Sequence, residues 1–173
     1  MIYPFNKWFV WKSDADNLTK QILALMNENA DLKNSLNIAE PVSYGTITYS
    51  EDYNILRGLS PEVYLSDSFF NLTDMESAKV FTKETKVAYR AWTAQDHDCD
   101  NFSFALMGYW SEGLKSFATG IVWSDNHAFN IMIDKNKVIW IIEPQNNTYM
   151  TIDEAIAKSK GSLHYFPIRM VIL

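Results

Sequence analysis

The stretch "FATGIVWSDNHAFNIMIDKNKVIWIIEP", Phe117 to Pro144, decides the fold of this chain. It contains three runs rich in Ile, Val and aromatic residues, at 117–124, 127–134 and 137–144, and each is typical of a short strand. The last two runs are separated by "DKNK", whose Asp and Asn residues favour a turn. The stretch therefore predicts three consecutive strands, the last two forming an antiparallel hairpin.

Helical patterns surround these strands. We expect helices over residues 13–41 and 73–92, a third from Cys99 to near Gly113, and a fourth over 151–161. A short strand is expected over 42–50, ordered loop over 57–74 and a final strand over 165–173. Because helices come first and the sheet later, the class is α+β rather than a parallel βαβ arrangement.

Length and composition limit the possible functions. A chain of 173 residues predicts one domain, residues 1–173, and its net charge of -6 argues against non-specific attraction to nucleic acid or anionic membranes. A single cysteine excludes a disulfide framework and a cysteine-rich zinc site. We find no signal peptide and no apolar run of the ~18 residues that a membrane span needs, so a cytoplasmic protein is expected.

The first predicted helix carries a heptad-like apolar stripe. Its members are Leu18, Ile22, Leu25, Leu32 and Leu36, with Asn29 in the same register. The stripe fits either a helix packed on the protein's own core or a homodimer formed through the helix at 14–37. The aromatic content of 14% likewise fits either a well-filled core or a groove lined with rings.

The only cysteine, Cys99, stands between a polar loop and an apolar helix, in "DHDCDNFSFAL". A helix N-terminus favours a thiolate through its free amides and partial positive charge, whereas carboxylates facing the sulfur oppose it. A nucleophilic cysteine also needs an imidazole and a group that orients the ring. His127 opens one predicted strand and Glu143 ends the next. A cysteine at a helix start, followed by these two residues, is the papain-like order of catalytic residues.

Three segments, "DCDNFSFAL", "GLKSFATGIVWSDNHAFNIMI" and "VIWIIEPQN", resemble the C-terminal cysteine-protease domain of the Marasmius-type fungal agglutinin and related phage proteins. The resemblance covers residues 98–146, and the H-A-x-N and E-P-Q elements carry it. It implies a papain-like fold in which N-terminal helices, including the nucleophile helix, pack on a C-terminal antiparallel sheet. It also implies that Cys99 is the nucleophile, His127 the general base and Glu143 the orienting acid. The agglutinin's lectin domain has no counterpart here, so sugar binding is not implied.

Other polar residues are candidates for supporting roles. The Gln95 side chain is a candidate oxyanion-hole donor, and Asn130 and Gln145 lie on the predicted hairpin where they could support the site. The resemblance implies calcium dependence, with candidate ligands at Asp96, Asp98, Asp100 and Asp125, and Asn101 and Asn126 as further oxygen donors. The alternative is that these carboxylates are solvated or cap helices. No organic cofactor is expected.

The sequence thus predicts a cysteine peptidase that forms an acyl-enzyme on a peptide or protein substrate. The alternatives are a CHAP-type peptidoglycan amidase and a non-catalytic phage or host-interaction protein that keeps the fold.

The hairpin makes a geometric prediction. His127 and Glu143 meet only if they share a face of the sheet, which requires direct opposition or an offset of an even number of residues. We expect direct opposition, which pairs Phe129 with Ile141 and leaves the three-residue loop 134–136 with Asn136 in the left-handed region.

Overall fold

The computed structural model of the chain describes residues 20, 39–94, 98–113, 115–160 and 164–173. The chain divides into two units, Met1–Ile38 and Ala39–Leu173, and the second holds all the elements discussed below. The first predicted helix and the homodimer through 14–37 lie outside the described residues, apart from Lys20. The single domain over 1–173 therefore stays a prediction.

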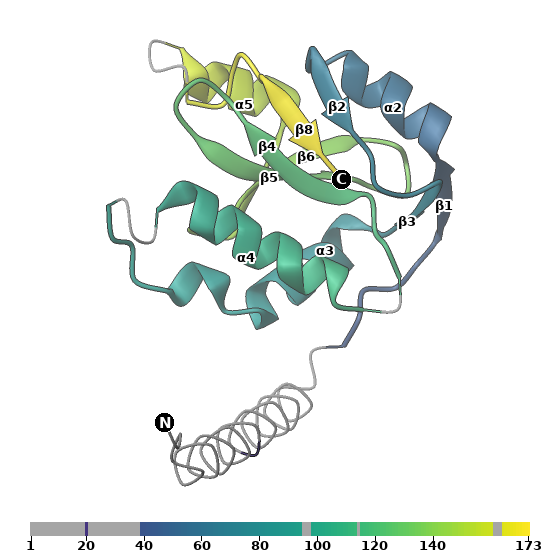
Figure 1. Ribbon diagram of the computed structural model, residues 1–173, viewed down its shortest axis with the longest axis horizontal. Coiled ribbons are helices and arrows are strands. Elements are labelled where there is room, and N and C mark those ends of the chain that lie inside the picture. The colour runs from purple at the N-terminus through teal and green to yellow at the C-terminus, as the bar shows by residue number, and fades with distance from the viewer. Residues whose placement is uncertain (1–19, 21–38, 95–97, 114, 161–163) are drawn as a thin grey trace, which may run out of the picture. The chain divides into compact units, whose positions relative to one another are not determined.

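Helices and strands are mixed along the second unit, which confirms the α+β class (Figure 1). In chain order the elements are β1 (Gly45–Thr48), α2 (Tyr49–Arg57), β2 (Glu62–Tyr64), β3 (Phe69–Leu72), α3 (Met75–Glu84), the 3-10 helix η1 (Val87–Tyr89), α4 (Cys99–Ser111), β4 (Thr119–Trp123), β5 (Ala128–Ile133), β6 (Ile139–Glu143), β7 (Thr148–Thr151), α5 (Ile152–Ser159) and β8 (Met170–Ile172).

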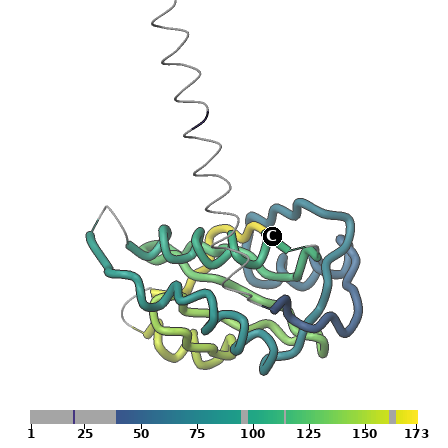
Figure 2. The backbone as a smooth tube through the Cα atoms, turned by 90° about the horizontal axis from the view of Figure 1, so that it is seen from below, coloured from purple at the N-terminus to yellow at the C-terminus, as the bar shows by residue number. Residues whose placement is uncertain are grey.

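The main sheet has six strands in the order β2-β8-β4-β5-β6-β7. Neighbouring strands are antiparallel except β2 and β8, which are parallel. Strands β1 and β3 form a separate antiparallel pair. The sheet lies between α5 on one side and α3 and α4 on the other, and Figure 2 shows the molecule from the side of α3 and α4.

Strand β5 is buried on both faces, which explains its continuous apolar sequence. On one face, Phe129, Ile131 and Ile133 belong to a core that also contains Ala155 of α5. On the other face, the Asn130 side chain donates to the backbone carbonyl of Ser103 in α4 at 3.0 Å. The sheet therefore holds α4 and α5 on opposite faces of the same strand.

The helix starts follow the capping residues of the sequence. Asp74 accepts from the amide of Ser77 at 2.7 Å before α3, and Thr151 accepts from the amide of Glu154 at 3.3 Å before α5. The amide of Asp98 donates to Asn101 Oδ1 at 3.2 Å and fixes the start of α4. The predicted helix start at Cys99 is confirmed.

Other expectations were wrong in part. The segment 57–74, expected as loop, contains β2 and β3, and helix α2 and strand β7 were not predicted. These strands have three or four residues, and β2 and β3 form against partners distant in sequence, so local pattern carries little signal. In the final segment, only Met170–Ile172 is strand.

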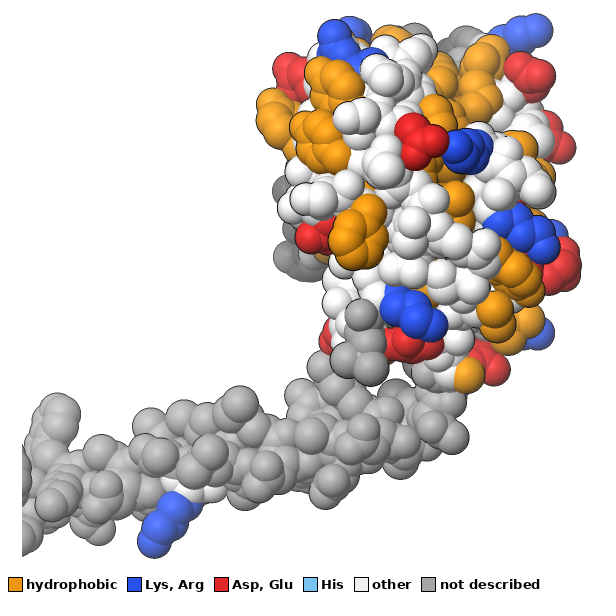
Figure 3. All heavy atoms as spheres, turned by 90° about the vertical axis from the view of Figure 1, so that its right-hand side faces the viewer, with side chains coloured by type: hydrophobic (Ala, Val, Ile, Leu, Met, Phe, Trp, Pro, Cys, Tyr) orange, Lys and Arg blue, Asp and Glu red, His pale blue; other side chains and the backbone are white. Residues whose placement is uncertain are grey.

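The aromatic content is divided between core and surface. Phe70, Phe102 and Phe129 are among the largest fully buried side chains. Tyr64 and Phe69, by contrast, are more than half exposed. Figure 3 views the molecule from the side of α2, β1 and β2 and shows apolar side chains at several places on this face. Among the described helices, none combines the length and apolar character needed to cross a membrane.

The β5–β6 hairpin keeps the predicted shared face but not the predicted register. Ile131 pairs with Ile141 and Ile133 with Ile139, which shifts the pairing by two residues from direct opposition of His127 and Glu143. The loop has three residues, 135–137, and Lys137 rather than Asn136 takes the left-handed conformation, with φ of 61°.

The Asp134 side chain explains this register. It accepts from the amides of Asn136 at 2.8 Å and Val138 at 2.9 Å, and from Trp140 Nε1 at 3.1 Å. These three bonds hold the loop one residue later than expected. Because the shift in pairing is even, His127 and Glu143 still share a face.

Candidate functional site

The centre of the site is a buried imidazole–carboxylate pair. The Nε2 atom of His127, which directly precedes β5, lies 2.7 Å from Oε2 of Glu143 at the end of β6. The side chains of His127 and Glu143 are only 5% and 6% exposed. The predicted hydrogen bond between them is confirmed, although they are not directly opposed.

Glu143 has further donors around it. Tyr165 donates its hydroxyl to Glu143 Oε2 at 3.0 Å, and the amide of Gln145 donates to Oε1 at 3.4 Å. Burial raises the pKa of Tyr165, and the charge of Glu143 and this hydrogen bond raise it further. Tyr165 therefore stays a neutral donor, and Glu143 has partners on both oxygens.

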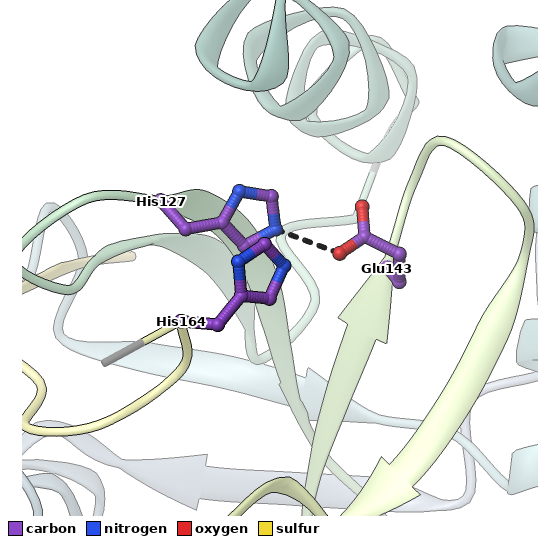
Figure 4. Close-up of side chains that lie close together, drawn as sticks. All are labelled: His127, Glu143 and His164. Atoms are coloured by element: carbon purple, nitrogen blue, oxygen red, sulfur yellow. Dashed lines mark hydrogen bonds and ion pairs between the residues drawn. The ribbon is translucent and has the colours of Figure 1, made fainter. Parts of the chain in front are cut away.

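A second imidazole lies against the first. The rings of His127 and His164 stack with centroids 3.9 Å apart and planes 16° apart (Figure 4). Burial lowers the pKa of His164, and the neighbouring His127 lowers it further, whereas Glu143 acts in the opposite direction. His164 is therefore held in its neutral form near pH 7.

Ser124 fixes both histidines through their backbones. Its hydroxyl donates to the carbonyl of His164 at 2.6 Å and lies 3.2 Å from the carbonyl of His127. The amide of His127 in turn donates to Ser124 Oγ at 3.1 Å. One buried serine thus connects the β4–β5 loop to the segment that precedes β8.

A hollow of about 250 Å³ opens beside this cluster. Its lining combines acids, polar groups, one thiol and one indole: Asp98, Cys99, Asp100, Trp123, Ser124, Asp125, Asn126, His127 and Ala128. Cys99 is half-buried at the first turn of α4, and Trp123 packs edge-on against Phe104 at 5.7 Å between centroids. Within the described residues, Cys99 and His127 line the same hollow but are not joined by a hydrogen bond.

The carboxylates of the hollow are in two different states. A side-chain hydrogen bond to Asp98 raises the pKa of Asp100, and burial and the charge of Asp98 add to this. Asp125 instead forms an ion pair with Arg169, which lowers the pKa of the carboxyl. Among the described carboxylates of the hollow, Asp98 and Asp100 have no ion pair with a cationic side chain, and carboxylate oxygens are ligands that suit a hard cation.

The remaining predicted residues lie as follows. Gln95 and Asp96 lie outside the described residues. Asn130 donates to the carbonyls of Ser103 and Gly120, both at 3.0 Å, so it holds α4 on the sheet. Gln145 contacts Glu143 through its backbone amide.

Sequence reasoning missed Ser124, His164, Tyr165 and Trp123. His164 and Tyr165 are far from His127 in sequence, and only the path of the chain after α5 brings them there. The hydroxyl of Ser159 at the end of α5 accepts from the amides of Tyr165 at 2.8 Å and Phe166 at 3.1 Å. The only sequence signal was a histidine–tyrosine pair before the last strand.

Chemically, the site offers a thiol, two imidazoles, a buried carboxylate and a cluster of acids around an indole. Such a set is able to bind polar ligands, coordinate cations or move protons.

Comparison with known proteins gives a fold but no family. No protein-family model and no curated protein sequence matches the chain. Among solved structures, it resembles a PSL1a–E64 complex, with 17% identity, a TM-score of 0.57, and coverage of 74% of this chain and 51% of that chain. It also resembles Polyporus squamosus lectin bound to the human-type influenza-binding epitope Neu5Aca2-6Galb1-4GlcNAc, with 17% identity, a TM-score of 0.56, and coverage of 74% and 49%.

At this identity the likeness shows a shared fold, and the chain spans about half the length of each neighbour. Both neighbours are structures of a lectin, which contradicts the expectations drawn from the fungal-agglutinin protease resemblance. The predictions of a papain-like cysteine peptidase, a thiol hydrolase and a peptide or protein substrate are therefore corrected. The CHAP-type amidase and the phage or host-interaction protein find no support either.

Proposed function

We propose that the hollow beside Trp123 and His127 binds a glycan. The observation that carries the proposal is the combination of one indole with acids, an amide and a hydroxyl around a cavity of about 250 Å³. A ligand pocket of this kind needs apolar contact for affinity and a few placed polar groups for orientation. A sugar ring offers both an apolar C–H face and a rim of hydroxyl groups.

The polar lining matches the hydroxyl groups of a sugar. Asp98, Asp100 and Asp125 present carboxylate oxygens as acceptors, and a sugar hydroxyl donates to such an oxygen while accepting from another group. Hydrogen bonds to a charged acceptor are stronger than those between neutral groups. The hollow therefore holds several strong acceptors within the reach of one ring.

Trp123 supplies the apolar contact. It ends β4, lines the hollow and is half-buried, so part of the indole remains open to a ligand. Its edge-on contact with Phe104 restrains the ring, which reduces the entropy lost on binding. An indole face contributes a large apolar area at one position.

The charge of the hollow favours a neutral glycan. Three carboxylates line it, only Asp125 is paired with a cation, and the whole chain carries a net charge of -6. A sialylated glycan would bring another carboxylate into this field and be repelled. The lectin neighbour was solved with a glycan bound, although a sialylated one, and this supports a glycan as the class of ligand.

Binding of two glycans that differ by one charge tests the proposal. We expect the neutral disaccharide Galb1-4GlcNAc to bind and the sialylated trisaccharide Neu5Aca2-6Galb1-4GlcNAc to bind more weakly. Trp123→Ala should lose binding, whereas Trp92→Ala, which changes an exposed indole outside the hollow, should keep it. Equal loss in both variants, or preference for the charged glycan, contradicts the proposal.

We also propose that Asp98 and Asp100 hold a calcium ion at the edge of this hollow. The support is that both carboxylates line the hollow, that the charge of Asp98 raises the pKa of Asp100, and that calcium prefers oxygen ligands. Asp125 fits less well because Arg169 already neutralises it, and Asp96 remains a candidate on sequence alone. Calcium should raise the melting temperature of the unmodified chain but not of Asp98→Asn/Asp100→Asn. A rise that is equal in both proteins would contradict the assignment.

A third proposal concerns the thiol. We propose that Cys99 is a reactive thiol with His127 as its imidazole, Glu143 as the orienting carboxylate and Gln95 as a candidate donor. The support is the position of Cys99 at a helix N-terminus in the hollow that His127 also lines. Iodoacetamide should label Cys99 faster than free cysteine at neutral pH, and His127→Ala should slow the labelling. Labelling at the rate of free cysteine in both proteins would contradict it.

A further inference from the structure

His127, His164 and Glu143 form a cluster of metal-binding groups inside the fold (Figure 4). One ligand atom from each residue lies within 4.8 Å of the other two. The figure shows both imidazoles with a nitrogen on the side of the Glu143 carboxylate. We propose that these three residues bind a divalent transition-metal ion, with zinc as the preferred ion.

The donor set selects zinc over the hard cations. Two imidazole nitrogens and one carboxylate oxygen are common zinc ligands, whereas calcium and magnesium take oxygen ligands almost alone. Three protein ligands occupy three positions of a tetrahedral zinc ion and leave the fourth open to water or another ligand. This site is therefore distinct in chemistry from the all-oxygen Asp98–Asp100 pair.

Binding needs a shift of the ligand atoms and a turn of one imidazole ring. Zinc lies about 2.0–2.1 Å from nitrogen and oxygen ligands, so two tetrahedral ligands are separated by about 3.3 Å. His127 Nε2 and Glu143 Oε2 are 2.7 Å apart, and the stacked histidine rings have centroids 3.9 Å apart. The metal would replace the proton between His127 and Glu143, opening that contact by about half an ångström. Because the nitrogen lone pairs lie in the ring planes and these planes are only 16° apart, one imidazole must also turn out of the stack so that both rings point at the ion.

The surrounding groups already hold the three ligands in place. Tyr165 donates to Glu143 Oε2 at 3.0 Å, and an outer partner of this kind orients a metal ligand and raises affinity. The Ser124 hydroxyl donates to the His164 carbonyl at 2.6 Å and accepts from the His127 amide at 3.1 Å, so it holds the backbones of both histidines. His127 also lines the hollow, so one residue of the cluster borders a space that is open to solvent.

The inference does not rest on glycan binding, because the metal is measured alone. Zinc should be titrated into the full-length chain by calorimetry after treatment with a chelator, in a buffer that does not bind metal. We expect one saturable site. Cobalt in place of zinc should give the visible absorption of a four-coordinate ion.

His164→Phe is the sharpest variant, because phenylalanine keeps an aromatic ring for stacking on His127 but supplies no ligand. We expect it to lower zinc affinity roughly 100-fold. His97→Ala is the matched control, because it removes the one histidine that the proposal does not use, and it should leave affinity unchanged. The melting temperature of each variant shows whether it folds.

Nitrogen-15 NMR of the imidazoles tests the site without any variant. Zinc should shift the resonances of His127 and His164 and leave those of His97. The absence of saturable binding, retained affinity in His164→Phe, or shifts confined to His97 would overturn the proposal. If the unmodified chain binds zinc but does not bind the glycan, only the proposed function is contradicted.

Discussion

The Nε2 atom of His127 lies 2.7 Å from Oε2 of Glu143, although the two residues are two positions away from direct opposition across the β5–β6 hairpin. Their shared face and the burial of both side chains bring them together. The same carboxylate accepts from Tyr165, so it connects the hairpin to the segment before β8.

Removal of Glu143 should therefore destabilise the protein. Glu143→Ala leaves the buried Tyr165 hydroxyl and the buried imidazole without their acceptor, and we expect a loss of roughly 2–4 kcal/mol in the free energy of unfolding. Glu143→Gln keeps the shape and one acceptor oxygen, so its loss should be smaller. Urea unfolding measures both, and equal stability of Glu143→Ala and the unmodified chain would contradict this role.

Asp134 should be equally important for the hairpin register. Asp134→Ala removes the acceptor of two loop amides and of Trp140 Nε1, and we expect a loss of roughly 2–3 kcal/mol. Asp134→Asn retains one acceptor oxygen and should lose less. If urea unfolding gives the same stability for both variants, the side-chain bonds do not fix the loop.

Asp52 should make stability depend on pH. It is fully buried in α2, its carboxylate oxygens have no hydrogen-bond partner in the described part of the chain, and burial raises its pKa to about 7. In the unfolded chain the Asp52 carboxyl loses its proton near pH 4, its ordinary pKa. Between about pH 4 and pH 7 the folded state therefore binds more protons than the unfolded state. The contribution of Asp52 to the free energy of unfolding is full below about pH 4 and is lost as the pH rises to about 7.

Asp52→Asn should abolish this slope and raise the free energy of unfolding at pH 7.5 by roughly 2–4 kcal/mol. His164 acts with the opposite sign, because its lowered pKa makes stability fall as the pH drops below about 6.5. The difference between the variant and the unmodified chain isolates Asp52. Parallel stability curves from pH 4.5 to pH 8 would show that Asp52 is ionised in the fold.

The sequence predicted those elements whose signal is local. The β4–β6 runs, the start of α4 at Cys99 and the helix α5 within 151–161 depend on side-chain type and neighbouring capping groups. Strands β2 and β3 depend on partners distant in sequence, β8 and β1, so a three- or four-residue pattern did not reveal them. The hairpin register depended on Asp134, whose side-chain bonds outweigh the preference of Asn136 for the left-handed region.

The site was predictable where residues belong to one hairpin or to the start of α4, whose Asp98, Cys99 and Asp100 line the hollow as His127 does. Strand alternation placed His127 and Glu143 on one face, and the hydrogen bond followed. His164 and Tyr165 arrive through the segment after α5, which has no periodic pattern to indicate its path. The function expected from the motif resemblance was not supported by the lectin structures that share the fold.

Nitrogen-15 NMR titration with the neutral disaccharide Galb1-4GlcNAc tests the proposed glycan site most directly. We predict saturable shifts of the Trp123 indole and of backbone amides in the ranges 98–100 and 123–128, which line the hollow. The shifts should disappear in Trp123→Ala and remain in Trp92→Ala. No shift at saturating disaccharide, or shifts confined to residues away from the hollow, would contradict the proposal that this hollow binds a glycan.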